Sequence, residues 1–191
     1  GSEMCIRDRL ATVSQTAIAF FGIYFKLQSF IYMPANGLIQ GMRPLISYNY
    51  GARHFDRVKK IIKVSIISTA VILCCGTIIF MGLPELVLSW FNATEQLLEI
   101  GIIGLRVISP CFILSTMGVV ISGVFESLGK GRQSLTISLL RQFIITLPLA
   151  YILLKVIGLN GIWLSFVIAE GIASVIAVIL IKKELHNFKV D

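Results

Sequence analysis

One apolar stretch near the start of the chain carries a regular row of side chains that can form hydrogen bonds and recognise charge. Seven residues recur at alternating steps of three and four, and six of them are polar: Lys26, Ser29, Met33, Asn36, Gln40, Arg43 and Ser47. Because side chains three and four positions apart share one face of a helix, this spacing predicts a single stripe along that helix.

The stripe has two interpretations, since each unpaired polar group in hydrocarbon costs several kcal/mol and must face protein or water. It lines a solvated cavity, or it packs against neighbouring helices through interhelical hydrogen bonds worth about 0.6 kcal/mol each. We favour the cavity because two cations on one stripe, Lys26 and Arg43, are costly to bury for packing alone. Lys26 can also extend toward the membrane surface.

Other charged and amide side chains fall inside later apolar stretches, where each predicts a functional or pairing role. Glu170 is the deepest acid, and a charge at that depth costs at least about 2.5 kcal/mol on insertion scales. Counting residues places it near the depth of Lys26 and about a turn from Arg106 and Arg141. We expect a structural ion pair; the alternatives are a carboxylate that responds to protons or substrate, and a neutral buried acid. For Arg141 and Gln142 we favour cavity or interhelical contacts.

The first apolar stretch ends in "GMRPLISYNYGARHFDRVKK", where polar, aromatic and basic residues follow one another. Arg43 lies at the end of the stripe, and Asn49 stands between two tyrosines that suit a membrane interface. We therefore predict a place on the same pathway for Arg43 and Asn49. The basic residues that follow are expected to contact anionic membrane lipid.

The composition is that of a membrane protein. Of the 191 residues, 56% are hydrophobic and only 14% charged, against roughly 25% charged in soluble globular domains. The net charge of +7 comes from short clusters between apolar stretches, which argues against nucleic-acid binding. No G-x-S-x-G, H-E-x-x-H or P-loop pattern is present, and the cysteines and histidines lack metal-site spacing. We expect neither an enzyme nor a bound cofactor or metal.

Five apolar stretches are long enough to span a bilayer. They run over about 17–46, 61–81, 100–125, 135–157 and 161–181. The predicted fold is therefore all-α, a polytopic bundle of five transmembrane helices. Asn92 and Glu95, which stand in the spacing of a capping box, predict a helix start before the third stretch.

Loop charges predict the orientation of these helices. Basic connections alternate with connections that have few or no basic residues, so the positive-inside rule places the basic ones and the C-terminus in the cytoplasm. Residues 1–9, "GSEMCIRDR", then carry arginines on the outer side, and we expect a non-native, adapter-like tail there. We assign 10–16 to the end of a preceding helix and its turn, 17–183 to the helical bundle, and 184–191 to a cytoplasmic tail.

Three stretches resemble one transporter family: "GIYFKLQSFIYMPANGLIQGMRPLISYNYGA", "ESLGKGRQSL" with "LLRQFIITLPLAYIL", and "GLNGIWLSFVIAEGIAS". They are similar to the C-terminal lobe of multidrug and toxic compound extrusion (MATE) transporters. The resemblance implies a fold of twelve helices in two six-helix lobes, with this chain supplying helices eight to twelve. The implied partner is the missing N-terminal lobe of the same polypeptide.

The resemblance also implies an inner-membrane exporter of organic cations or drugs that takes up H⁺ or Na⁺ in exchange. Some members of the family carry coupling acids in the tenth helix, but the matching stretch here, residues 100–125, contains none. Two alternatives stay open at this stage. One is a flippase of the same superfamily that moves a lipid-linked saccharide; the other is a membrane scaffold subunit that transports nothing.

Overall fold

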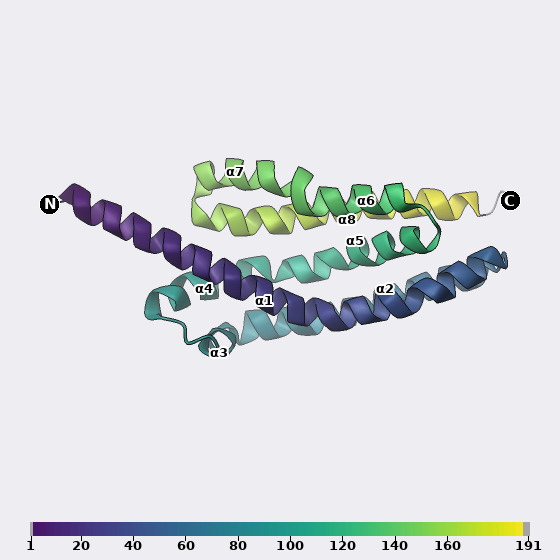
Figure 1. The fold of residues 1–191 in the computed structure, drawn as a ribbon, viewed down its shortest axis with the longest axis horizontal. Helices are drawn as coiled ribbons and strands as arrows, with labels where there is room; N and C mark the ends of the chain where they lie inside the picture. Colours follow the sequence, from purple (N-terminus) through teal and green to yellow (C-terminus); the bar gives the residue numbers. More distant parts are fainter. Residues whose placement is uncertain (1, 189–191) are drawn as a thin grey trace.

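A computed structural model describes the backbone of residues 2–188 and the side chains of residues 14–188. Within this part of the chain the regular elements are all helices (Figure 1). They are α1 (Ser2–Gly51), α2 (Phe55–Gly82), α3 (Pro84–Ser89), α4 (Glu95–Ile108), α5 (Pro110–Ser127), α6 (Gly131–Leu139), the π-helical turn η1 (Leu140–Ile144), α7 (Thr146–Ile157) and α8 (Leu159–Asn187). The predicted all-α class is confirmed.

Five helical segments are long and apolar enough to cross a membrane, which confirms the predicted number of spans. They are Ser14–Gly51, Phe55–Gly82, Pro110–Ser127, Gly131–Ile157 and Leu159–Asn187. The third differs from the predicted stretch 100–125, because the helix is divided at Ser109 into α4 and α5. Pro110 has no N–H to continue the ladder of α4, and its fixed φ suits the first position of a new helix.

Two details at helix ends differ from the sequence expectations. The N-cap of α4 is Thr94, whose hydroxyl accepts a hydrogen bond from the N–H of Leu97 at 3.3 Å. Asn92 instead has a left-handed φ of 51° in the preceding turn, so its predicted capping role is wrong. Residues 10–16, where we expected a turn, are helical and continuous with the rest of α1. The origin of residues 1–9 stays a prediction.

Helix α5 is the centre of the bundle and packs against α1, α2, α6 and α8. In its span 61% of the residues are buried, against no more than 33% of the apolar window in each of the other four spans. Its two halves belong to different apolar clusters. The first contains Phe20, Phe112 and Trp163, and the second contains Ile39 and Ile121. The middle of α5 lies between the two clusters and carries small and polar residues.

The basic segments gather at one end of the bundle, where the α1–α2 turn, the α5–α6 connection and the end of α8 meet (Figure 1). Lys130 pairs with Glu184 there, with Nζ and Oε1 2.5 Å apart. Phe188 stacks on Phe55 with ring centroids 4.9 Å apart. The alternation of loop charge along the sequence thus corresponds to a real asymmetry between the two ends of the molecule.

Candidate functional site

A buried ion pair joins η1 to α8. Arg141 donates from Nε to Oε2 of Glu170 at 2.9 Å and from Nη2 to Oε1 at 3.0 Å, so both carboxylate oxygens are engaged. The two side chains are only 13% and 12% exposed. Such a two-point contact fixes the orientation of both groups as well as their separation. Glu170 therefore pairs with Arg141, which was one of the partners considered for it from the sequence.

The local backbone explains how Arg141 reaches Glu170. Residues 140–144 form a π-helical turn, in which backbone hydrogen bonds join residues five apart instead of four. The hydroxyl of Thr146 donates to the carbonyl of Arg141 at 2.7 Å. On the neighbouring helix α5, a Cβ added at Gly118 would lie 2.8 Å from Cδ of Arg141. The absent side chain of Gly118 thus provides the space that the arginine stem occupies.

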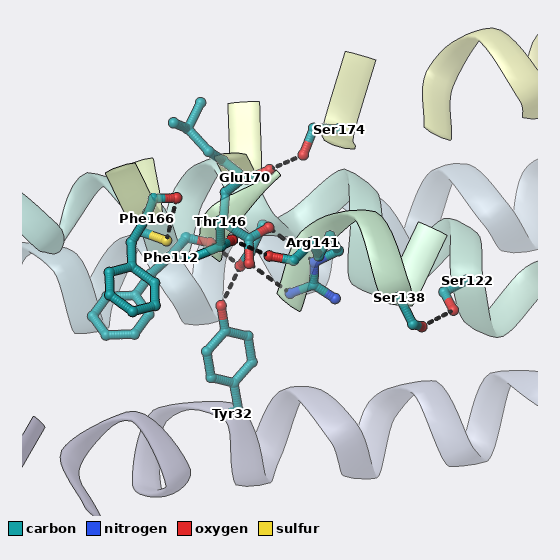
Figure 2. A network of polar contacts seen from close by, with 12 residues as sticks. Tyr32, Phe112, Ser122, Ser138, Arg141, Thr146, Phe166, Glu170 and Ser174 are labelled. Carbon is teal, nitrogen blue, oxygen red and sulfur yellow. Dashed lines mark hydrogen bonds and ion pairs between the residues drawn. The ribbon is translucent and has the colours of Figure 1, made fainter. Parts of the chain in front are cut away.

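Polar side chains from α1, α5 and α8 surround the ion pair (Figure 2). Tyr32 points from α1 toward Arg141 and Glu170, and its hydroxyl donates to Oγ of Ser115 on α5. Ser174, one turn after Glu170, donates to the carbonyl of Leu114. These contacts form a polar layer across the bundle between the two apolar clusters, and every group named in it has a protein partner.

A groove of about 480 Å³ opens beside this polar layer. Its walls come from α1, the middle of α5 and η1. The residues that line it are Gln28, Ser29, Tyr32, Met33, Asn36, Val119, Arg141 and Gln142. Most of these side chains are uncharged hydrogen-bonding groups, so the groove can bind a ligand through amides and hydroxyls.

The groove brings together only some of the residues predicted from the sequence. Asn36, Arg141 and Gln142 line it, and Glu170 lies behind Arg141 without lining it. The stripe along α1 is on the surface of the described bundle: Lys26, Ser29, Met33, Asn36, Gln40 and Ser47 are exposed, and Arg43 is half-buried. Packing against helices of this chain therefore does not account for most of the stripe.

The remaining predicted residues lie elsewhere. Lys26 and Arg106 are exposed and outside the groove, on α1 and α4. Arg43 forms an ion pair with Glu126 of α5 and donates to Oε1 of Gln40 at 3.4 Å, close to the basic end of the bundle. Asn49 is buried and donates to the carbonyl of Leu45 in its own helix at 2.8 Å.

The structure also adds lining residues that the sequence interpretation missed. Gln28 and Tyr32 are spaced by four residues from each other, and Asn36 follows by four more, so the three form a row that meets the predicted stripe at Asn36. This spacing is visible in the sequence and could have been found. Val119 carries no such signal because an apolar residue in an apolar helix is expected everywhere.

Metal and disulfide chemistry find no support in the described residues. Between residues 14 and 188 no group of three or more His, Cys, Asp or Glu side chains stands close enough to hold a metal ion. Cys74, Cys75 and Cys111 are free, and Cys111 donates weakly from Sγ to the carbonyl of Phe166 at 3.6 Å.

Comparison with known proteins identifies the same family as the sequence resemblance. The family model MatE matches residues 9–152. The chain is 31% identical over 183 residues to the multidrug export protein MepA of Staphylococcus haemolyticus, and 30% identical over 182 residues to MepA of Staphylococcus aureus strain MSSA476. These matches cover 95% of this chain and 40% of each relative, so the chain spans about two fifths of the length of its curated relatives.

Solved structures agree on the fold. The outward-facing structure of a multidrug resistance MATE transporter of the MOP superfamily superimposes with a TM-score of 0.86, at 19% identity, over 100% of this chain and 45% of that one. The MATE multidrug transporter DinF-BH gives a TM-score of 0.80 at 29% identity, over 90% and 38% of the two chains. The chain therefore belongs to the MatE family, as the resemblance predicted, and it is a multi-pass membrane protein built like part of a MATE transporter.

Proposed function

We propose that this chain is the C-terminal lobe portion, helices eight to twelve, of a secondary active exporter of organic cations or drugs. The exporter would take up H⁺ or Na⁺ in exchange and work by alternating access between two lobes. The observation that carries the proposal is the polar groove beside the exposed stripe of α1, in a chain of this family. In transporters built from repeats, substrate sites lie near the bilayer midplane at the interface between the repeats.

The groove has the properties that such a pathway requires. It lies at the level of the polar layer between the two apolar clusters, and its side chains are mostly amides and hydroxyls, together with one thioether, one valine and the guanidinium of Arg141. Most of the stripe is exposed to a partner surface or to water, although Arg43 pairs with Glu126 and Ser47 donates to the carbonyl of Ser127. We infer that the partner surface is the N-terminal lobe of the same polypeptide, which agrees with the share of its relatives that the chain covers.

The charge asymmetry of the bundle supports an orientation. We propose that the basic end, which includes Arg53, Lys130 and Lys182, faces the cytoplasm of a cell with this protein in its inner membrane. The C-terminus then lies in the cytoplasm, and the bundle contacts anionic lipid headgroups at that end.

The carboxylate that binds the coupling ion is proposed to lie outside this chain. Residues 100–125 contain no acid, and Glu170, the acid in the middle of α8, has both oxygens on Arg141. Because both oxygens already accept from Arg141 and its charge is paired, Glu170 attracts a second cation less strongly than an unpaired carboxylate would. Coupling through the other lobe leaves this lobe the task of shaping the substrate path.

Thiol accessibility tests the groove and the stripe. In the full-length transporter without native cysteines, Asn36→Cys and Gln40→Cys should react with a membrane-impermeant thiol reagent, because both positions are exposed. Ile39→Cys is the matched control, since Ile39 is 4% exposed and packs in the second apolar cluster. A transported cation should slow the reaction at Asn36 more than at Gln40, because only Asn36 lines the groove. Equal inertness at all three positions would exclude a solvated pathway along α1.

A further inference from the structure

We propose that Glu170 determines the charge class of the ligand that the groove accepts, by neutralising Arg141 from behind the groove wall. The inference rests on the proposed function and names the property that selects the substrate. It assigns Glu170 a role in specificity without contact between its carboxylate and the ligand.

The formal charge on the groove wall affects which ligands the groove can accept. Of the described residues that form its wall, Arg141 alone carries a formal charge. The others offer the amides of Gln28, Asn36 and Gln142 together with neutral hydroxyl and apolar groups. With Arg141 uncompensated, such a groove would repel organic cations and attract anions.

The ion pair places the carboxylate of Glu170 against Arg141 but outside the groove lining. Glu170 is absent from the groove lining, yet both of its oxygens bind Arg141, at 2.9 and 3.0 Å. The pair is 13% and 12% exposed, so solvent screens it little. A ligand in the groove therefore meets hydrogen-bond donors from Arg141 without a net positive charge.

The electrostatic effect of an uncompensated Arg141 on the affinity for a bound ion is large enough to control selectivity. At an effective dielectric constant of about 20, a unit charge about 6 Å from a bound ion changes its affinity by about a hundredfold. Screening by water in an open groove reduces this effect, and we expect a change of at least about tenfold. A tenfold change lies at the upper end of what one neutral hydrogen bond in the groove contributes.

Two ions of nearly the same size and opposite charge provide the test. In the full-length transporter, the dissociation constants of tetraphenylphosphonium and tetraphenylborate are measured by equilibrium binding, and their ratio is compared among variants. Glu170→Gln should shift the ratio toward the anion by at least about tenfold. Gln142→Lys, which adds an uncompensated cation on the groove wall, should shift it in the same direction. The double variant Arg141→Gln with Glu170→Gln should return the ratio toward the wild-type value.

The outcomes separate this inference from the proposed function. If Gln142→Lys shifts the ratio and a folded Glu170→Gln does not, Glu170 does not set the charge class. Should Glu170→Gln fail to fold, the double variant decides, because it removes both buried charges. A ratio that moves from the wild-type value toward the cation would show that Glu170 does not neutralise Arg141 and would overturn the inference. If the wild-type protein binds neither ion, or if no variant changes the ratio, the groove is not the binding site and the proposed function itself fails.

Discussion

At the level of single residues, burial distinguishes two ion pairs that look alike in the sequence. Arg141 and Glu170 are 13% and 12% exposed, whereas Arg43 and Glu126 are 35% and 41% exposed. Removing one partner of a buried pair leaves a charge that water cannot reach, and this typically costs about 3–5 kcal/mol. Exposed pairs typically contribute about 0–1 kcal/mol.

This difference predicts unequal effects of two chemically identical substitutions. Glu170→Gln should lower the free energy of unfolding by about 3 kcal/mol or more, because the guanidinium of Arg141 loses its counter-charge. The matched control Glu126→Gln should change it by no more than about 1 kcal/mol. Thermal unfolding in detergent, followed by a fluorescent probe, measures both. A stable Glu170→Gln variant that has lost only transport would contradict a structural role and assign Glu170 to proton or substrate coupling.

At single residues, the sequence was most informative where an unpaired charge would be energetically very unfavourable. A lone acid deep in an apolar helix must find a partner, and Arg141 was among the few cations at a matching depth. Asn49 shows the limit, because its amide donates to the carbonyl of Leu45 in its own helix, while its Oδ1 is buried without a partner among the described residues. A short polar side chain inside a helix can always bond to its own backbone, so its type and position do not reveal a pathway.

At the level of secondary-structure elements, the π-helical turn η1 is the feature that the sequence does not predict. The stretch 135–157 has the apolar composition of one regular helix, and its visible irregularity is Pro148, four residues beyond the end of η1. The extra residue of a π-turn changes the register of the following side chains against the neighbouring helices. Register depends on the contacts of Arg141 with α5 and α8, which only the assembled bundle defines.

Thr146 provides a test of that turn. Thr146→Val removes the hydrogen bond that the buried hydroxyl of Thr146 donates to the carbonyl of Arg141. We expect a loss of about 0.5–1.5 kcal/mol in the free energy of unfolding. The matched control is Thr136→Val, whose hydroxyl bonds to the carbonyl of Arg132 in the exposed, regular helix α6. Equal effects of the two variants in thermal unfolding would show that η1 has no special need of the Thr146 hydroxyl.

At the level of the whole molecule, five spans and their alternation were predictable because lipid imposes both length and polarity on a helix. Pro110 marks the helix break at Ser109, but a proline alone does not establish that a transmembrane helix is divided, since such helices often continue through one. The contacts that join distant segments could also not be predicted from the sequence. The stacking of Phe188 on Phe55 links the end of the last helix to the turn between the first two.

This aromatic contact should stabilise the basic end of the bundle. Phe188→Ala removes a side chain that is 8% exposed and packs on Phe55 and Tyr50, so we expect unfolding to become easier by about 2–4 kcal/mol. Phe188→Leu should recover part of the loss by filling the same volume. Phe143→Ala is the control, because Phe143 is 53% exposed. An unchanged melting temperature for Phe188→Ala would show that the end of α8 is not anchored there.

The Arg141–Glu170 pair also constrains the order in which the chain enters the membrane. Arg141 is synthesised 29 residues before Glu170, and the two lie on consecutive spans joined by a tight turn at Gly158. Until Glu170 arrives, the guanidinium of Arg141 would stand uncompensated at a depth that disfavours any lone charge. The last two spans should therefore leave the insertion machinery together as a hairpin, with their opposite charges already joined before either helix meets lipid alone.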